Sequence, residues 1–221
     1  MKVVRGRRIT PLDAAVLRDL RQRFAHCLVD VGTGDGRFVY RTAVERPDTL
    51  CIGLDPVAEA LRKTSDKAAR KPARGGLDNA LFLIAAAEDL PGPLAGVADE
   101  IIVNYPWGSL LRGITEPQAS MLETLAGLAR PQGAAFLFLI NASVFADDDY
   151  RDRLSLPPLD ADWARRELIP AYAAAGWVLQ EVEELAGDAP HHTSWGRRLV
   201  RGSGRRTLLL AGRIRRGGIR P

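Results

Sequence analysis

The chain has 221 residues and a formal net charge of +4, with 31 lysines and arginines against 27 acidic residues. This length suits one α/β domain that buries about 70% of its unfolded surface, so we expect residues 1–221 to form a single domain. No apolar run reaches the roughly 18 residues that a membrane span needs, and no apolar signal segment follows Met1. Two cysteines and three histidines give little support for a metal centre. The composition predicts a soluble, cytoplasmic protein without bound metal.

The N-terminal segment is basic. Residues 1–10 alternate short apolar and basic side chains, and they could form a small strand or hairpin. Thr10 and Pro11 then predict the start of a helix that continues to about Phe24. We expect residues 1–25 to be an N-terminal extension and residues 26–221 to be the core.

Apolar strands alternate with helices along the core. Strands are expected at 27–31, 50–54, 80–84, 100–103, 134–140, 177–185 and 206–214. Helices are expected at 36–45, 57–70, 117–129 and 160–175. Strands separated by helices predict a doubly wound, mostly parallel sheet of seven strands, whose last two strands could pair antiparallel. Residues 186–204 join these last strands, and a connection of that length is usually functional or mobile.

A glycine-rich turn follows the first core strand. Gly32, Gly34 and Gly36 alternate as G-x-G-x-G, and Arg37 stands where the dinucleotide fingerprint G-x-G-x-x-G has its third glycine. Asp30, just before the glycines, would oppose an anionic pyrophosphate but would complement a cation. These features favour S-adenosylmethionine, whose sulfur and amino group are positive, over a dinucleotide. The alternative is that the acids only shape turns.

The other strand ends should meet the same edge of the sheet, where ligands bind in such folds. Asp55 could accept hydrogen bonds from the ribose hydroxyls of the cofactor. A backbone amide near Ala87 and the Glu88 carboxylate could recognise its adenine, although Glu88 could equally be a turn acid. Asn104 and Trp107 end the fourth strand, beside the expected position of the methyl group.

Two tryptophans could hold a nucleobase. Trp107 follows a strand and either packs on the next helix or offers its face to a purine. Trp195 lies in a polar loop with little core to fill, which favours stacking on the other face of the base. Stacking contributes about 1 to 3 kcal/mol per base, enough to offset much of the few kcal/mol needed to extrude a nucleotide.

Basic residues gather in three places. One cluster lies at the N-terminus, and a second lies between the second and third core strands. From His191 to Pro221 there are nine arginines and no acidic residue. A single cluster is usually only solvated surface, but three clusters beside a cofactor site indicate binding to a nucleic acid.

With these residues in view, the chain resembles the aminoglycoside-resistance methyltransferases of the kanamycin-apramycin type, which modify N1 of adenine-1408 in 16S ribosomal RNA. The resemblance runs nearly end to end. Its motifs are Val29–Gly36, Gly53–Pro56, Lys71–Leu77, Ala86–Pro91, Pro106–Leu111 and Thr193–Trp195. The Pro106–Leu111 and Thr193–Trp195 motifs are the specific ones.

The resemblance implies a class I S-adenosylmethionine-dependent methyltransferase with a Rossmann-like fold. It implies that Trp107 and Trp195 clamp a flipped adenine, and that the substrate is 16S rRNA in the assembled 30S subunit. We expect the protein to act as a monomer. The cofactor site expected from the residues and the resemblance consists of Asp30, Gly32, Thr33, Gly34, Gly36, Asp55, Pro56, Ala87, Glu88, Asn104, Ser109 and Thr193. The residues expected to contact RNA are Lys67, Arg70, Lys71, Arg74, Arg197, Arg198, Arg201, Arg205 and Arg206.

One feature departs from the pattern of the family, where apolar residues precede Pro-Trp. This chain has Asn104 and Tyr105 there, which resembles the Asn-x-Pro-aromatic motif of enzymes that methylate exocyclic amino groups. N6 is therefore the alternative target atom. A nicotinamide-dependent oxidoreductase and a non-catalytic RNA-binding module are the remaining alternatives.

Overall fold

The strands form a single mixed sheet. A computed structural model describes residues 1–117, 119–145, 151–152, 156–186 and 206–215. Within them the strand order is β2-β1-β5-β4-β3-β6-β7-β9-β8. The strands after the N-terminal segment are β3 (His26–Val31), β4 (Thr49–Asp55), β5 (Ala80–Ile84), β6 (Glu100–Asn104), β7 (Ala134–Asn141), β8 (Trp177–Ala186) and β9 (Arg206–Ile214). These are the seven expected strands.

The centre of the sheet is parallel. Strands β5, β4, β3, β6 and β7 pair in parallel, whereas β9 runs antiparallel to both β7 and β8. The strand order reverses direction at β3, because β4 lies on one side of it and β6 on the other. This is the switch point at which open α/β sheets bind their ligands. The expected fold class is confirmed.

The N-terminal segment extends the sheet. Strands β1 (Lys2–Arg5) and β2 (Arg8–Pro11) form the expected hairpin, and β1 also pairs antiparallel with β5. The predicted helix start at Thr10 was wrong, because Thr10 and Pro11 belong to β2. Helix α1 (Ala14–Gln22) instead begins after Asp13, whose carboxylate accepts a hydrogen bond from the Ala15 amide at 2.6 Å.

Helices cover both faces of the sheet. The α-helices of the central part are α2 (Arg37–Glu45), α3 (Ala58–Ala68), α4 (Gly108–Thr115) and α5 (Ala119–Gly127). Short 3-10 turns lie at η1 (Pro72–Arg74), η2 (Gly92–Leu94) and η3 (Ala142–Phe145). Near the C-terminus, the expected single helix is built from α7 (Ala161–Trp163), a π-helical turn η4 (Ala164–Leu168) and α8 (Ile169–Ala174). Helix α4 was not predicted.

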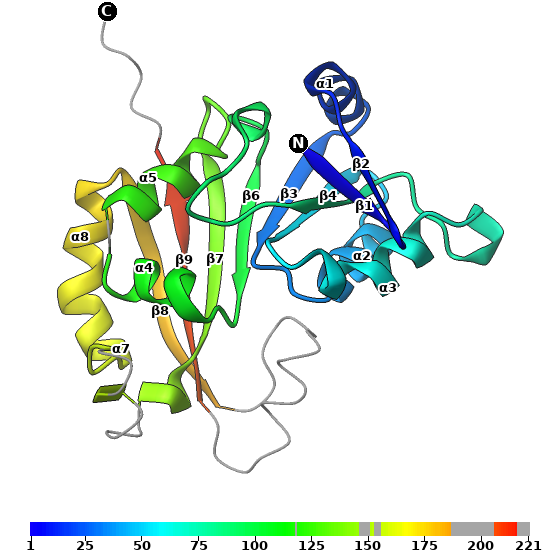
Figure 1. Ribbon diagram of the computed structural model, residues 1–221. Coiled ribbons are helices and arrows are strands. Elements are labelled where there is room, and N and C mark those ends of the chain that lie inside the picture. The colour runs from blue at the N-terminus through cyan, green and yellow to red at the C-terminus, as the bar shows by residue number, and fades with distance from the viewer. Residues whose placement is uncertain (118, 146–150, 153–155, 187–205, 216–221) are drawn as a thin grey trace, which may run out of the picture.

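Two apolar layers sandwich the sheet, with α1, α4, α5 and α8 on one face and α2 and α3 on the other (Figure 1). The layers follow the alternation of strand side chains: Val29 and Ile101 belong to the first layer, and Leu28 and Ile102 to the second. In the first layer Trp177 packs edge-on against Phe136, with ring centroids 4.9 Å apart. This packing lies in the half of the sheet near the start of β7.

Both cysteines are free thiols in the core, and burial raises the pKa of Cys27 and of Cys51 to about 12. Within the described ranges, every helix is too short or too polar to cross a lipid bilayer. No group of acidic, histidine and cysteine side chains in the same ranges could hold a metal ion.

Candidate methyl-donor and target-base site

The glycine turn leaves room for a ligand directly beyond β3. Gly32 and Gly34 have positive φ angles of 72° and 59°, a backbone conformation that side chains disfavour. The amides of Gly32 and Thr33 both donate to the Leu54 carbonyl at 2.9 Å, which ties the turn to β4. A Cβ atom on Gly34 would meet nothing within 4 Å, so this side of the turn is open space.

Asp30 is a buried carboxylate with one unused oxygen. Its side chain is only 1% exposed, and Oδ1 accepts a hydrogen bond from Nδ2 of Asn104 at 3.1 Å. Among the described residues, Oδ2 has no hydrogen-bond partner. Burial raises the pKa of Asp30 to about 7, against the opposing effects of the Thr33 side chain and the Asn104 amide. An orphaned acceptor of this kind fits a ligand that brings a positively charged donor.

Asp55 lies at the end of the neighbouring strand and stabilises the loops on both sides of the site. Its Oδ2 accepts from the Gly34 amide at 2.9 Å, and its Oδ1 accepts from the Val57 amide at 2.8 Å. Burial raises the pKa of Asp55, and these two hydrogen bonds oppose the rise. Each oxygen keeps a second lone pair, so the carboxylate can still accept from two ligand hydroxyls.

The target side of the site is built on a strained turn after β6. Tyr105 has a φ of 50°, which is uncommon for a residue with a side chain. Its amide donates to the Leu139 carbonyl at 2.7 Å, and its ring is buried against Leu139 and Leu209. Trp107, two residues later, is 42% exposed rather than packed into the core. This exposure leaves part of the Trp107 ring accessible from the cavity.

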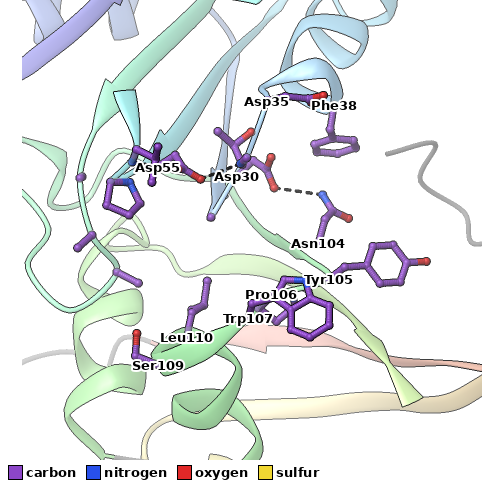
Figure 2. A pocket seen from close by; sticks show the side chains of 18 of the residues that line it. Asp30, Asp35, Phe38, Asp55, Asn104, Tyr105, Pro106, Trp107, Ser109 and Leu110 are labelled. Carbon is purple, nitrogen blue, oxygen red and sulfur yellow. Dashed lines mark hydrogen bonds between the residues drawn. The ribbon is translucent and has the colours of Figure 1, made fainter. Parts of the chain in front are cut away.

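These elements enclose a cavity of about 320 Å³ at the switch point. Figure 2 shows Asp30 between Asp55 and Asn104, with Tyr105 and Trp107 on the Asn104 side. Ten of the twelve residues expected at the cofactor site line it: Asp30, Gly32, Thr33, Gly34, Asp55, Pro56, Ala87, Glu88, Asn104 and Ser109. Trp107 also lines it.

One expected cofactor residue that the structure describes, Gly36, does not line this cavity. Gly36 has a φ of 70°, and a Cβ atom there would lie 2.5 Å from the Phe82 ring. This glycine therefore serves the turn into α2 and its packing. Thr193 falls in residues 187–205, outside the described residues, as do Trp195 and the arginines at 197, 198, 201 and 205.

Sequence reasoning missed several lining residues. Phe38, Val57 and Leu110 add apolar surface, and Asp35 adds a carboxylate. Phe38 stands two residues after the last glycine, in the first turn of α2, so its place in the motif could have suggested it. Leu110 belongs to the helix that was not predicted, although Leu110, Leu111 and Ile114 have helical spacing.

Comparison with known proteins places this geometry in a family. The profile of NpmA, 16S rRNA (adenine(1408)-N(1))-methyltransferase, matches residues 2–214. The chain belongs to this methyltransferase family. A 16S rRNA (adenine(1408)-N(1))-methyltransferase of Streptoalloteichus tenebrarius is 41% identical over 210 residues, which cover 90% of this chain and 92% of the relative.

Solved structures agree with this placement. A tryptophan-to-alanine mutant of the 16S rRNA (adenine(1408)-N(1))-methyltransferase from Catenulisporales acidiphilia, with cosubstrate SAM, is 34% identical. It has a TM-score of 0.90, and the match covers 100% of this chain and 99% of that one. The antibiotic-resistance methyltransferase Kmr is 43% identical with a TM-score of 0.80, covering 97% of this chain and 100% of that one. The resemblance stated from the sequence is confirmed.

The residues between β4 and β5 that the sequence predicts as RNA contacts form a basic surface. We call Lys67, Arg70, Lys71 and Arg74 the α3–η1 cluster. All four side chains are exposed, and the last three surround a shallow depression. Lys67 lies over the Tyr40 ring, with Nζ 4.2 Å from its centroid, and Arg70 pairs with Asp66 at 2.9 Å. The cluster is anchored to α2 through Tyr40, whose hydroxyl donates to the Gly75 carbonyl.

Arg206 is the one expected C-terminal RNA contact that falls within the described residues. It is exposed and forms an ion pair with Glu184 at 2.9 Å. Its amide donates to the hydroxyl of Ser143 at 3.1 Å, beside the end of β7. Asn141, at the end of β7, accepts a hydrogen bond from the Ser143 amide and does not line the cavity.

Proposed function

We propose that this protein uses S-adenosylmethionine to methylate N1 of adenine-1408 in 16S rRNA and so confers resistance to aminoglycosides. The observation that carries the proposal is the cavity at the switch point, in which an orphaned carboxylate and an exposed tryptophan line one space. Family membership over residues 2–214 supports the choice of substrate.

The cofactor residues fit the methyl donor by charge and shape. Asp30 offers its free oxygen to an ammonium group, Asp55 offers acceptors to the ribose hydroxyls, and the open side of Gly34 admits a ligand close to the backbone. Ala87 and Glu88 lie at the end of the cavity formed after β5, where they would contact the adenine ring. When bound, S-adenosylmethionine supplies a methyl group on a positively charged sulfur.

The remaining work of the protein is to position the target. N1 of an unpaired adenine already carries a lone pair, so no general base is needed to expose it. Trp107 would stack on one face of the flipped base, and Trp195 would close over the other face. Holding two reactants in attack geometry can contribute on the order of 7 to 11 kcal/mol. This agrees with the lining of the cavity, which holds no cysteine or histidine among the described residues.

The α3–η1 cluster and the C-terminal arginines would dock on the folded rRNA. Phosphate contacts supply affinity and fix the register, while the flipped base provides the specificity. We propose that the substrate is the assembled 30S subunit, because the family is named for its action on the 16S rRNA of that subunit, and that the protein acts as a monomer in the cytoplasm.

Transfer of labelled methyl groups from S-adenosylmethionine tests this function. Purified 30S subunits, free 16S rRNA and 50S subunits would each be incubated with the protein. We expect incorporation into 30S subunits and much less into the other two substrates. No incorporation into any of them would leave a non-catalytic RNA-binding module as the better explanation.

A further inference from the structure

Two neighbouring strands of the sheet bring Asp30 and Asn104 together. β3 and β6 pair in parallel, with Asp30 opposite Ile102, so Asn104 projects just beyond the strand pair. Its Nδ2 donates to Oδ1 of Asp30 at 3.1 Å, and Figure 2 shows Asn104 between Asp30 and the aromatic pair of Tyr105 and Trp107. Both residues line the cavity. One oxygen of the carboxylate is thus held by the protein, and the other is left for a ligand.

The surroundings of Asp30 disfavour its ionised form. The pKa of the carboxyl is raised to about 7; burial is the largest cause, and the charge of Asp55 on β4 acts in the same direction. The Thr33 side chain and the Asn104 amide on β6 act in the opposite direction, because a donor stabilises the ionised form. Among the described residues, Asp55 is the one charged side chain identified as acting on Asp30, and it repels the negative form.

We propose that Asn104 is a positioning residue that stabilises the carboxylate form of Asp30 and turns its second oxygen toward the amino group of the methyl donor. The inference rests on the proposed function, since it assumes that S-adenosylmethionine occupies the cavity. It assigns to Asn104 a role in binding the amino-acid part of the cofactor, acting through Asp30.

A specific pH dependence follows from this arrangement. The ammonium group pairs well with the carboxylate and poorly with the neutral acid, so affinity falls as the pH drops through about 7 and Asp30 takes up a proton. Removing the Asn104 amide raises the pKa of Asp30 further. The Asn104 variant therefore loses affinity most at low pH. At high pH its affinity approaches that of the wild type, because Asp30 is then ionised in both proteins.

Ligand binding to the whole protein tests the proposal. Dissociation constants are measured by calorimetry between pH 6 and 8.5 for S-adenosylhomocysteine, which has the amino-acid part, and for 5′-methylthioadenosine, which lacks it. The variants are Asn104→Leu and the smaller Asn104→Ala, with thermal unfolding as a folding check. Asn141→Leu is the matched control, because Asn141 ends the neighbouring strand β7 without lining the cavity.

If the substitution raises the pKa of Asp30 by one unit, the dissociation constant of the variant for S-adenosylhomocysteine should exceed that of the wild type by a factor of about 9 at pH 6. The factor should be about 5 at pH 7 and under about 2 at pH 8.5. The ratio for 5′-methylthioadenosine should stay near one at every pH, as should both ratios for Asn141→Leu.

A loss of affinity for both ligands, or a loss that does not change with pH, would overturn the proposal, because it would indicate general damage to the site. Unchanged affinity of both Asn104 variants for S-adenosylhomocysteine would also overturn it. Failure of the proposed function has a different signature: the wild-type protein would then bind neither ligand.

Discussion

Asp30 shows how a single side chain can be costly for the fold and useful for the site. It is enclosed at the end of β3, where the Asn104 amide donates to one of its oxygens. Its other oxygen has no hydrogen-bond partner among the described residues. A buried polar group without its full set of partners is destabilising unless a ligand completes the set. The protein without cofactor should therefore be less stable than its packing alone would allow.

The first prediction concerns Asp30→Asn in the absence of ligand. The folded pKa of about 7 lies above the ordinary value of 3.8, so between these values the unfolded chain is ionised while the folded chain stays neutral. The free energy of unfolding of the wild type is therefore highest at low pH with respect to Asp30, and it falls as the pH rises toward 7. Each unit of elevation corresponds to about 1.4 kcal/mol.

Thermal unfolding at pH 5 and pH 8 provides the measurement. We expect the advantage in Tm of Asp30→Asn over the wild type to be several degrees larger at pH 8 than at pH 5. The same difference in Tm between Asp30→Asn and the wild type at both pH values would show that burial does not raise the pKa of this carboxyl.

The second prediction concerns Trp107. Its exposed ring contributes little to the core, so Trp107→Ala should leave Tm and the affinity for S-adenosylhomocysteine nearly unchanged. Removal of one stacking partner, worth about 1 to 3 kcal/mol, should lower methylation of 30S subunits by roughly five- to 150-fold. Trp107→Phe keeps a smaller aromatic face and should recover part of the rate. Wild-type turnover by Trp107→Ala would exclude a stacking role.

At the scale of elements, two glycines in the turn between β3 and α2 have different roles: Gly34 serves ligand binding and Gly36 serves folding. Our third prediction compares two substitutions in this turn. Gly36→Ala places a Cβ atom 2.5 Å from the Phe82 ring at a positive φ, and it should lower the free energy of unfolding by about 2 kcal/mol or more. Gly34→Ala meets open space, so only the backbone strain of about 1 to 2 kcal/mol should remain.

Cofactor binding should show the reverse order: Gly34→Ala should weaken it more than Gly36→Ala does, because Gly34 lines the cavity and Gly36 does not. Urea unfolding and calorimetry with S-adenosylhomocysteine measure the two effects. A greater stability loss in Gly34→Ala than in Gly36→Ala would contradict the assignment.

Much of the element pattern could be predicted from the sequence, because apolar strands bounded by turn residues are strong local signals. The strand from Trp177 and the strand from Arg206 to Ile214 agree with the structure to within a residue. Helix α4 was missed because it begins at Gly108, directly after a Pro-Trp turn, where local signals indicate a loop. The π-helical turn in η4 was also missed, since it depends on packing and not on a residue pattern.

The site could be predicted in part for a similar reason. Residues at strand ends were found because topology places those ends together, as with Asp30, Asp55 and Asn104. The hydrogen bond between Asp30 and Asn104, and the turn at Tyr105 with its positive φ, depend on how β3, β6 and β7 pack, and no single segment encodes them. Whether Trp195 faces Trp107 stays a prediction, because it lies outside the described residues.

At the scale of the molecule, charge is distributed unevenly across the sheet. The edge strand β8 carries exposed Glu181 and Glu183, whereas the hairpin at the opposite edge carries Arg5 and Arg8, and the α3–η1 cluster lies on the α3 side (Figure 1). Such a distribution orients a protein as it approaches an RNA surface. We infer that the α3–η1 cluster faces the ribosome.

The fourth prediction tests this orientation. Lys71→Glu should weaken binding to 30S subunits and reduce the slope of log affinity against log salt by roughly one for each phosphate that the variant no longer neutralises. Arg166→Glu is a matched control, because Arg166 is equally exposed but lies on η4, at the β8 end of the sheet. Equal effects of both changes across a salt series would mean that only the net charge matters.

The most direct measurement identifies the methylated atom and its position. Primer extension on 16S rRNA from 30S subunits treated with the protein, together with nucleoside mass spectrometry of the fragment around the decoding site, gives both. We predict a strong stop at adenine-1408 and 1-methyladenosine as the product. No stop, or N6-methyladenosine in place of the N1 product, would contradict the account.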